Sequence, residues 1–339
     1  MKKIIASTIL VLTLVSCSKA ENGAVPIVKS EYTISGDKIL NSGKPIQLIG
    51  ANEFHSFGAS TTSNDAMKSW NMDIAREFIG NIKENPISGN STQDSNGSWL
   101  HSLQKIVDGN RLNNRITILC AFGWDGKSTN LFTGTMPKQT SWWSAYKSIL
   151  QNWAIQFKNQ PDVWIEVWNE PYRYDRADGY TDAIWITDMN EMVANIRDTG
   201  NQNIILVPVA EQGQDESVLI NKGIDLLRNK SNILFDIHAY EKWLLDSENN
   251  INNRLELLKQ KNLPIVFGET APLNAVVLMN PKPFLDIISA RGLSVCAWVW
   301  KNDENEIDAL LTSAGLPNDK NNNNWGSTFK NLSTKSRNP

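Results

Sequence analysis

Short apolar runs recur along the chain from residue 46 onward. They cover residues 46–50, 74–79, 116–121, 163–168, 204–209, 233–237, 264–268 and 293–300. Several of them are almost continuous in Val, Ile, Leu and other apolar residues, which is typical of parallel strands that are buried on both faces. The pattern therefore predicts eight buried strands in chain order.

A different period fills several of the intervals between these runs. Apolar residues three or four positions apart form stripes over residues 100–107, 142–157, 184–196 and 284–288. This spacing places them on one face of a helix. Strands that alternate with helices eight times over roughly 300 residues are typical of a (β/α)8 TIM barrel. We therefore expect an α/β protein in which residues 31–339 form a single barrel domain.

The alternative α/β architecture is a doubly wound open sheet. Such sheets often carry a Gly-x-Gly-x-x-Gly motif after the first strand, where it binds a dinucleotide. No such motif follows residues 46–50, and this favours the barrel. Ahead of the first run, residues 32–40 and a turn at Asn41-Ser42-Gly43 predict a β-hairpin whose second arm continues into residues 46–50.

The N-terminal segment is predicted to be a targeting signal rather than part of the fold. After a basic start, the apolar residues 4–15 are too few to span a bilayer and are typical of a secretory signal. The tetrad Leu14-Val15-Ser16-Cys17 resembles a bacterial lipobox, in which the Cys is lipidated and becomes the new N-terminus. We expect a lipoprotein signal peptide at residues 1–16, lipidation of Cys17 and a tether over residues 17–30. A plain signal peptide with a chance Cys is the alternative.

Composition narrows the classes of partner. Lys and Arg number 33 against 36 Asp and Glu, so the formal charge is −3 and we expect no nucleic-acid partner. The only expected membrane contact is the lipid anchor, which would hold the protein at a bacterial membrane surface, in the periplasm or on the cell surface. Cys120 and Cys296 lie in apolar runs and are expected to be buried free thiols. The 13 Trp residues outnumber the 10 Phe, and they either stack on sugars or fill the core.

Chemistry in such a barrel is carried by residues at the C-terminal ends of the strands. Glu170 follows the fourth apolar run and Glu269 follows the seventh, where an idle carboxylate would be costly to bury. Glycoside hydrolysis needs such a pair, one protonated to release the leaving oxygen and one ionised to attack the anomeric carbon or to activate water. This chemistry needs no cofactor, and no His, Cys or Asp cluster shows the spacing of a metal site.

The residues around these two positions resemble a known family. The segment Trp164-Ile165-Glu166-Val167-Trp168-Asn169-Glu170-Pro171 is similar to the strand-four signature of glycoside hydrolase family 5, a cellulase-type family in the (β/α)8 clan of retaining glycosidases. Its short Asn-Glu-Pro core gains specificity from further matches in the same order along the chain, at Arg76, His238-x-Tyr240, Glu269 and Trp300. The resemblance covers residues 46–303 and implies that the hairpin closes the floor of the barrel.

The resemblance implies a role for each matched residue. Glu170 is the general acid/base, and Glu269 is the nucleophile that forms a glycosyl–enzyme intermediate. Asn169 holds the substrate 2-hydroxyl, and the positive charge of Arg76 keeps the nucleophile ionised. Tyr240 is implied to donate a hydrogen bond to Glu269, and His238 to pack beside the acid/base. Trp300 is implied to be the floor on which the reacting sugar stacks.

One position departs from the family pattern. Family members usually carry a His after strand three, whereas here that strand runs into Leu119–Asp125, with Phe122 or Ala121 about where the His would be. That His usually helps to hold the reacting sugar, so its absence indicates a variant subfamily and leaves open which sugar fits. The substitution should not abolish the chemistry, because that His carries neither a proton nor a covalent bond in the reaction. In the same segment, Trp124 is a candidate sugar platform at an outer subsite.

These residues together predict an endo-acting, retaining hydrolase of β-1,4-linked polysaccharide or oligosaccharide, acting as a monomer. We expect a cellulase-type β-glucanase, with an endo-β-1,4-mannanase as the close alternative, because the two sugars differ only in the orientation of the C2 hydroxyl. An exo-acting enzyme would need a wall at one end of the cleft, which the Asn- and Ser-rich residues 80–98 could supply. The rival from another class is a carbohydrate-binding surface lipoprotein on an inactive barrel, which would have no need of both carboxylates.

Overall fold

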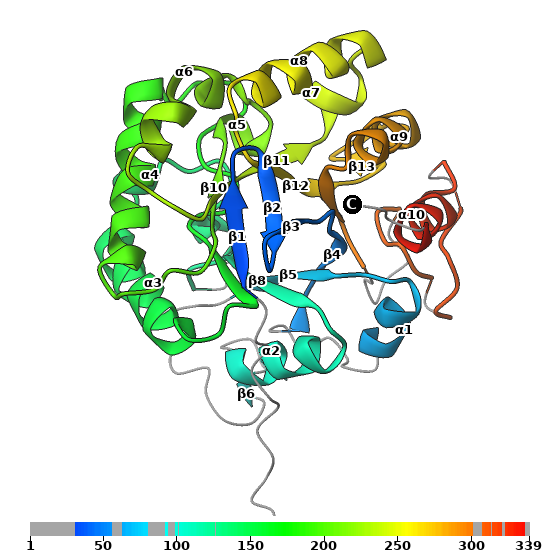
Figure 1. Ribbon diagram of the computed structural model, residues 1–339, viewed down its shortest axis with the longest axis horizontal. Coiled ribbons are helices and arrows are strands. Elements are labelled where there is room, and N and C mark those ends of the chain that lie inside the picture. The colour runs from blue at the N-terminus through cyan, green and yellow to red at the C-terminus, as the bar shows by residue number, and fades with distance from the viewer. Residues whose placement is uncertain are drawn as a thin grey trace, which may run out of the picture.

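A closed parallel barrel forms the centre of the molecule (Figure 1). The computed structural model describes residues 31–55, 63–80, 92–93, 99–100, 102–125, 127–300, 307–312, 314–320 and 323–335. The barrel strands pair in the closed order β10-β11-β12-β15-β4-β5-β8-β9. They are β4 Ile49–Glu53, β5 Ile74–Ile79, β8 Ile116–Ala121, β9 Val163–Glu166, β10 Ile205–Pro208, β11 Ile233–Ala239, β12 Ile265–Thr270 and β15 Ser294–Ala297. The predicted (β/α)8 barrel is confirmed, although the first strand begins three residues later than residue 46.

Helices form a ring around this barrel, as Figure 1 shows. The longer ones are α1 Ser63–Ser69, α2 Leu103–Leu112, α3 Trp143–Phe157, α4 Asp182–Arg197, α6 Ser217–Leu227, α8 Glu248–Gln260, α9 Lys282–Arg291 and α10 Trp325–Thr334. Short elements decorate the loops: α5 Ala210–Gly213, α7 Glu241–Leu244, η2 Ser128–Asn130, η3 Pro137–Gln139, and the strand pairs β6 Thr92–Gln93 with β7 Trp99–Leu100 and β13 Leu273–Asn274 with β14 Val277–Leu278.

Local sequence sets where several of these helices begin and end. Ser102, Thr181 and Ser247 are N-caps of α2, α4 and α8, and each side chain accepts a hydrogen bond from a backbone N–H of the first turn. Helix α9 ends at Gly292, whose φ of 65° is a left-handed conformation that glycine adopts without steric cost. These signals fix the ends of the helices, and burial of their apolar faces against the barrel stabilises them.

Two hydrophobic layers hold the fold together. The inner layer fills the barrel with side chains such as Ile74, Ile118 and Leu234. The outer layer lies between the barrel and the helices, and it contains five of the fully buried tryptophans: Trp168, Trp185, Trp243, Trp300 and Trp325. Much of the high Trp content therefore serves packing rather than sugar binding.

The N-terminal hairpin is a three-stranded meander rather than the two-armed hairpin that we expected. Its strands are β1 Tyr32–Ser35, β2 Lys38–Asn41 and β3 Lys44–Pro45, with an additional turn at Gly36, where φ is 57°. Ile39 and Leu48 join the inner layer, and Tyr32 packs edge-on against Trp164 at 5.7 Å between ring centroids. The meander therefore closes the barrel floor, as the resemblance implied.

Residues 1–30, which contain the predicted signal peptide, Cys17 and the tether, lie outside the described residues, and so does most of the connection 80–98. In the part of the chain that the structure describes, no helix combines the length and the hydropathy that a membrane span requires. Cys120 and Cys296 are buried free thiols, as predicted.

Candidate active site

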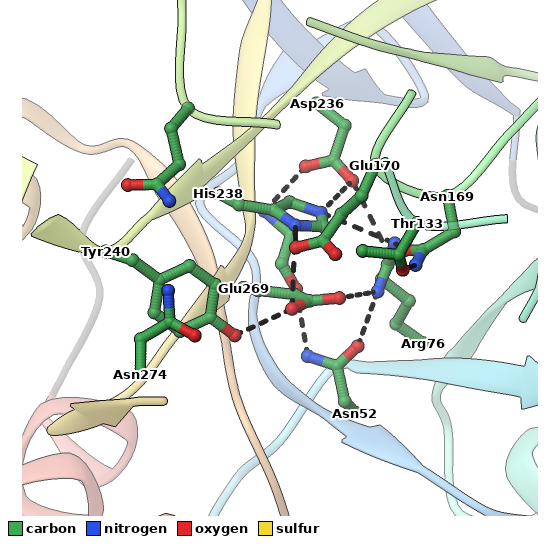
Figure 2. Close-up of polar contacts among 12 residues, drawn as sticks. Asn52, Arg76, Thr133, Asn169, Glu170, Asp236, His238, Tyr240, Glu269 and Asn274 are labelled. Carbon is green, nitrogen blue, oxygen red and sulfur yellow. Dashed lines mark hydrogen bonds and ion pairs between the residues drawn. The ribbon is translucent and has the colours of Figure 1, made fainter. Parts of the chain in front are cut away.

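Polar side chains gather where the barrel strands end (Figure 2). Arg76 comes from β5, His238 from β11 and Glu269 from β12, and all three are buried. Glu170 stands four residues after the end of β9, and its backbone adopts a left-handed φ of 48°, which is uncommon for a non-glycine residue. Its carbonyl oxygen accepts a hydrogen bond of 2.7 Å from Gly134 N–H, which holds this conformation in place.

Glu269 is held by one cation and one hydroxyl. Its Oε1 accepts a hydrogen bond of 2.6 Å from Arg76 Nη1, and its Oε2 accepts one of 2.7 Å from the Tyr240 hydroxyl. Burial raises the pKa of Glu269 above its ordinary value, whereas His238, Arg76 and Tyr240 favour the ionised form without offsetting burial fully. The implied contacts are thus present, but Arg76 does not bring the pKa of this carboxyl below its ordinary value.

Glu170 is the other carboxylate of the pair. Its Oε1 lies 2.9 Å from Nδ1 of His238, so the implied packing of His238 beside this residue is present. The side chain of Glu170 is 15% exposed, whereas that of Glu269 is 5% exposed. A carboxylate oxygen of Glu170 lies within 4.8 Å of one of Glu269, with His238 close to both. The site therefore has one carboxylate open to solvent and one that is deeply enclosed, a short distance apart.

Arg76 connects the polar groups at the base of the site. Its Nε and Nη2 donate to the two oxygens of Glu166 at 2.7 and 2.8 Å, and its Nη1 donates to Asn52 Oδ1 at 2.8 Å as well as to Glu269. Nη2 also donates to Asn169 Oδ1 at 3.0 Å. Burial raises the pKa of Glu166 to about 7, against the opposing effect of Arg76. Arg76 thus fixes both Glu269 and Asn169 from below.

Asn169 is almost completely buried beside Glu170. Its Oδ1 accepts from Arg76, and its Nδ2 donates to Thr133 Oγ1 at 3.0 Å. This orientation leaves the second amide hydrogen of Nδ2 for another acceptor, as a role in holding a sugar hydroxyl requires. That role stays a prediction.

Four residues of this network were missed in the sequence: Asn52, Thr133, Glu166 and Asp236. Glu166 interrupts the apolar run 163–168, Asp236 lies between the apolar residues Phe235 and Ile237, and both carboxylates are completely buried. That interruption is a usable signal, because a buried carboxylate needs a partner. Asn52 and Thr133 carry no comparable signal, since neutral polar residues are common near strand ends.

Trp300 is not the stacking floor that the resemblance implied. Its side chain is completely buried in the outer layer, where it packs edge-on against Trp70 at 5.0 Å. The partly exposed Trp298 lies at the mouth instead, with its ring 5.2 Å from Phe78 and packed near Tyr240. Trp298 is therefore the better candidate for that platform, because the regular strand ends at Ala297 and the alternation of faces ends with it.

The segment after β8 carries two of the predicted features. Phe122 is partly exposed and packs edge-on against Phe78 at 5.0 Å, so an aromatic ring stands where the family usually has a His. Trp124 is partly exposed, but Trp142 stacks on one of its faces at 6.2 Å. Trp124 can therefore offer only its other face to a sugar.

Two groups of described residues have ligand atoms that lie within 4.8 Å of one another, although their sequence spacing gave no indication of a metal site. They are Glu166, Asp236 and His238, and Glu170, His238 and Glu269. The guanidinium of Arg76 bonds to carboxylates of both groups and supplies positive charge there. Hydrolysis by two carboxylates requires no metal. The expectation of a metal-free site stays a prediction.

Comparison with known proteins places this geometry in a family. Residues 39–304 match the family described as cellulase (glycosyl hydrolase family 5). A mannan endo-1,4-beta-mannosidase of Cellvibrio japonicus (strain Ueda107) is 21% identical over 277 residues, which cover 79% of this chain and 60% of that protein. The beta-mannanase/endoglucanase A of Caldicellulosiruptor saccharolyticus is 21% identical over 84% of this chain but only 20% of its own length. The chain therefore spans a little under two thirds of the first relative and one fifth of the second.

Solved structures share the fold at low sequence identity. The catalytic domain of a mannanase from Streptomyces sp. SirexAA-E superposes with a TM-score of 0.67 at 19% identity, covering 94% of this chain and 96% of that one. An endoglucanase catalytic domain from Thermobifida fusca gives a TM-score of 0.67 at 16% identity, covering 90% and 97%. Because the family match covers most of the chain, the chain belongs to glycosyl hydrolase family 5.

Proposed function

We propose that this protein is an endo-acting, retaining β-glycanase that hydrolyses β-1,4-linked polysaccharide by double displacement. The observation that carries the proposal is the approach of carboxylate oxygens of Glu170 and Glu269 to within 4.8 Å. Retaining glycosidases place their carboxyl groups about 5–5.5 Å apart, whereas inverting enzymes need about 6.5–9.5 Å to admit a water molecule. The separation thus supports nucleophilic attack by one carboxylate.

Each half of the reaction uses both carboxylates. In the first step, Glu269 attacks the anomeric carbon, the bond to the leaving oxygen breaks, and Glu170 gives its proton to that oxygen. In the second step, Glu170 takes a proton from water, which attacks the anomeric carbon and releases Glu269. Asn169 would hold the 2-hydroxyl while positive charge develops on the sugar, and Trp298 would stack on the apolar face of the same sugar.

We propose mannan as the substrate, with β-1,4-glucan as the second candidate. This reverses the order favoured by the sequence alone. Two curated relatives carry mannanase or mannosidase in their names, and several mannanase structures share the fold. The glucan candidate rests on the endoglucanase activity named for one relative and on an endoglucanase structure with an equal TM-score.

A binding protein on an inactive barrel is the weaker alternative. Such a protein has no need to maintain two buried or half-buried carboxylates with a cation, a His and a Tyr around them, because burying these charges is costly. We also propose, on the basis of the tetrad that ends in Cys17, that the protein is exported as a lipoprotein on a bacterial membrane surface. The expectation that it acts as a monomer stays a prediction.

Release of reducing ends by protein lacking residues 1–17 tests the proposed activity. The substrates are galactomannan, glucomannan, carboxymethyl cellulose and mixed-linkage β-glucan, with Glu269→Ala as the blank. Hydrolysis of galactomannan supports the mannanase assignment, and hydrolysis of the glucans alone replaces it with the second candidate. Wild-type protein no more active than the blank on all four would contradict an endo-acting glycanase. NMR of the first products should show the β-anomer, and an early α-anomer would contradict retention.

A further inference from the structure

Asp236 is a fully buried carboxylate next to His238 on strand β11 (Figure 2). Its Oδ1 accepts a hydrogen bond of 2.7 Å from Gly268 N–H. Its Oδ2 has no hydrogen-bond partner among the described residues, but it lies 3.4 Å from His238 Nε2 and 3.7 Å from Arg76 Nε. A buried carboxylate oxygen needs a donor or a cation, and the ring nitrogen of His238 is the closer of the two groups.

Two glycines provide the space for Asp236 and His238. A Cβ at Gly268 would come within 2.2 Å of the Asp236 carboxylate, which no real contact tolerates. A Cβ at Gly213, where φ is 79°, would come within 2.7 Å of the His238 ring. The residue that precedes the nucleophile must therefore be glycine if Asp236 is to stay beside His238.

The other ring nitrogen of His238 lies between the two catalytic carboxylates. Nδ1 is 2.9 Å from Glu170 Oε1 and 3.5 Å from Glu269 Oε2. When Glu269 attacks the sugar, its negative charge is consumed, and a negative charge appears on Glu170 as its proton leaves. The second half of the reaction returns the charge to Glu269. A positively charged ring would therefore have a negatively charged neighbour in both states.

We propose that Asp236 is a positioning residue that keeps His238 doubly protonated, so that the imidazolium is the shared counter-ion for the charge that moves between Glu269 and Glu170. Nε2–H then faces Asp236, and Nδ1–H is donated to Glu170 Oε1, which leaves the acidic proton of Glu170 on Oε2. Burial lowers the pKa of His238, but Glu269, Asp236 and Glu170 together raise it well above its ordinary value. The inference rests on the acid/base role proposed for Glu170.

A neutral ring is the opposing arrangement. Arg76 Nη2 lies 3.4 Å from His238 Nε2, and an unprotonated Nε2 could accept a hydrogen bond from it. The two arrangements differ by one proton on Nε2. The partner of Nε2, Asp236 or Arg76, decides which arrangement is present.

The protonation state of His238 is the first test. The chain has three His residues, so ring-nitrogen NMR of protein labelled with ¹⁵N-histidine is tractable, with His238→Gln for assignment. We expect both ring nitrogens to be protonated between about pH 6 and 8, where an ordinary His loses its charge. A neutral wild-type ring at about pH 7 would overturn the proposal, whether or not any variant folds. Asp236→Asn should yield a neutral ring, because its oxygen must accept from Gly268 N–H and its amide group then faces Nε2.

Leaving-group dependence is the second test. The kcat/KM for aryl glycosides reports the first step, in which a dinitrophenolate departs without a proton whereas a poor leaving group needs the proton of Glu170. We expect Asp236→Asn to lower kcat/KM about 10- to 100-fold for poor leaving groups and less than about threefold for dinitrophenyl glycosides. General acid catalysis supplies roughly 10²–10⁴-fold in rate, and the variant should lose a part of that factor. The double variant with His238→Gln should be no slower than His238→Gln alone. Additive losses would mean that Asp236 acts independently of His238.

Two controls separate this inference from the proposed function. Glu166→Gln neutralises the carboxyl paired with Arg76, and it should slow both kinds of substrate alike because Arg76 contacts Glu269. Glu170→Gln should lose activity on glycosides with poor leaving groups and keep activity on dinitrophenyl glycosides. If Glu170→Gln shows this selectivity and Asp236→Asn does not, the inference fails alone. If Glu170→Gln shows no selectivity, the acid role of Glu170 fails.

Discussion

At the scale of single residues, each of the two carboxylates proposed to be catalytic depends on side chains from other strands. Glu269 on β12 is held by Arg76 from β5 and by Tyr240, which follows β11. Glu170 meets His238 from β11. Burial, and to a smaller extent the charge of Glu170, raises the pKa of Glu269, and the contacts with His238, Arg76 and Tyr240 determine how far it rises.

Tyr240→Phe should move the acidic limb of kcat/KM to higher pH. The lost hydroxyl donates to Glu269 Oε2, and this hydrogen bond favours the carboxylate. Glu269 must be ionised to attack, so activity falls as pH drops through its pKa, and a higher pKa moves that fall upward. A hydrogen bond to a charged group contributes about 1.5–3 kcal/mol, so we expect a shift of about one pH unit or more, measured as kcat/KM against pH.

Tyr146→Phe is the matched control. The Tyr146 hydroxyl is also buried, but it donates to the backbone carbonyl of Val167 at 2.8 Å. This variant should lose about 1 kcal/mol of stability and leave the acidic limb unchanged. If the acidic fall of kcat/KM lies at the same pH in Tyr240→Phe and in the wild type, the contribution that we assign to Tyr240 is contradicted.

Trp298→Ala and Trp300→Ala should fail in different ways. Trp298 is partly exposed at the mouth, so its loss should lower kcat/KM about tenfold or more, where a factor of ten corresponds to about 1.4 kcal/mol of transition-state binding. Trp300 is completely buried, so its loss should lower the free energy of unfolding by about 3–5 kcal/mol. Kinetics at a permissive temperature and chemical denaturation of both variants measure the contrast. A larger kinetic loss in Trp300→Ala would restore Trp300 as the sugar platform.

At the scale of elements, the meander of β1, β2 and β3 seals the end of the barrel away from the active site. A small sheet of this kind is not stable alone, and here it gains stability by placing Ile39 in the inner layer. The division of labour is typical of such barrels, in which residues at the floor stabilise the fold and residues at the mouth carry the chemistry.

Ile39→Ala should therefore lower stability without changing the chemistry. Ile39 is 5% exposed, and removing a buried Ile side chain costs about 2–5 kcal/mol. Urea denaturation measures this loss, and kcat of the folded protein should stay within a factor of about two, since stability effects far from the site leave rates intact. Ile224→Ala on α6, where the side chain is 51% exposed, is the control and should change stability by less than about 0.5 kcal/mol. Equal losses in both variants would contradict the role of the meander as a sealed floor.

At the scale of the whole molecule, the barrel is a compact domain that begins shortly after the predicted tether. The meander opens the described chain at the floor, on the opposite side of the barrel from Glu170 and Glu269. An anchor attached ahead of residue 31 would therefore join the molecule at the end that is remote from the catalytic mouth. This arrangement is compatible with action on a large polymer outside the membrane.

Cys17→Ala should release the protein from the membrane fraction. The acyl chains on a lipidated Cys17 would provide the membrane affinity, because the charge of the chain is close to balanced. Fractionation of expressing bacteria followed by immunoblotting measures the distribution, with Ser18→Ala as a control that keeps the cysteine. Persistent attachment of Cys17→Ala, or release of both variants, would mean that the tetrad is a coincidence.

The sequence predicted the architecture well because the barrel strands are buried on both faces. Apolar runs mark all eight barrel strands, and the stripes on residues 142–157 and 184–196 mark α3 and α4. The helical period did not identify α1, α6, α8 or α10. The meander was predicted as a two-armed hairpin because the turn at Gly36 was not recognised. Short turns leave weak signals, since one glycine is enough to make them.

By itself, the sequence determined the fold class, because buried strands need continuous apolar runs. It also singled out Glu170 and Glu269 as candidate catalytic residues, because a charge at the end of such a run is unusual. Only the tertiary structure decided which groups meet. It placed Asp236 beside His238, buried Trp300 while leaving Trp298 partly exposed, and joined Glu166 to Arg76. These contacts join strands that lie far apart in the sequence, and side-chain direction after a strand ends no longer follows the alternation of a regular strand. The distances between these groups and the direction of the pKa shift of Glu269 depend on contacts that exist only in the closed barrel.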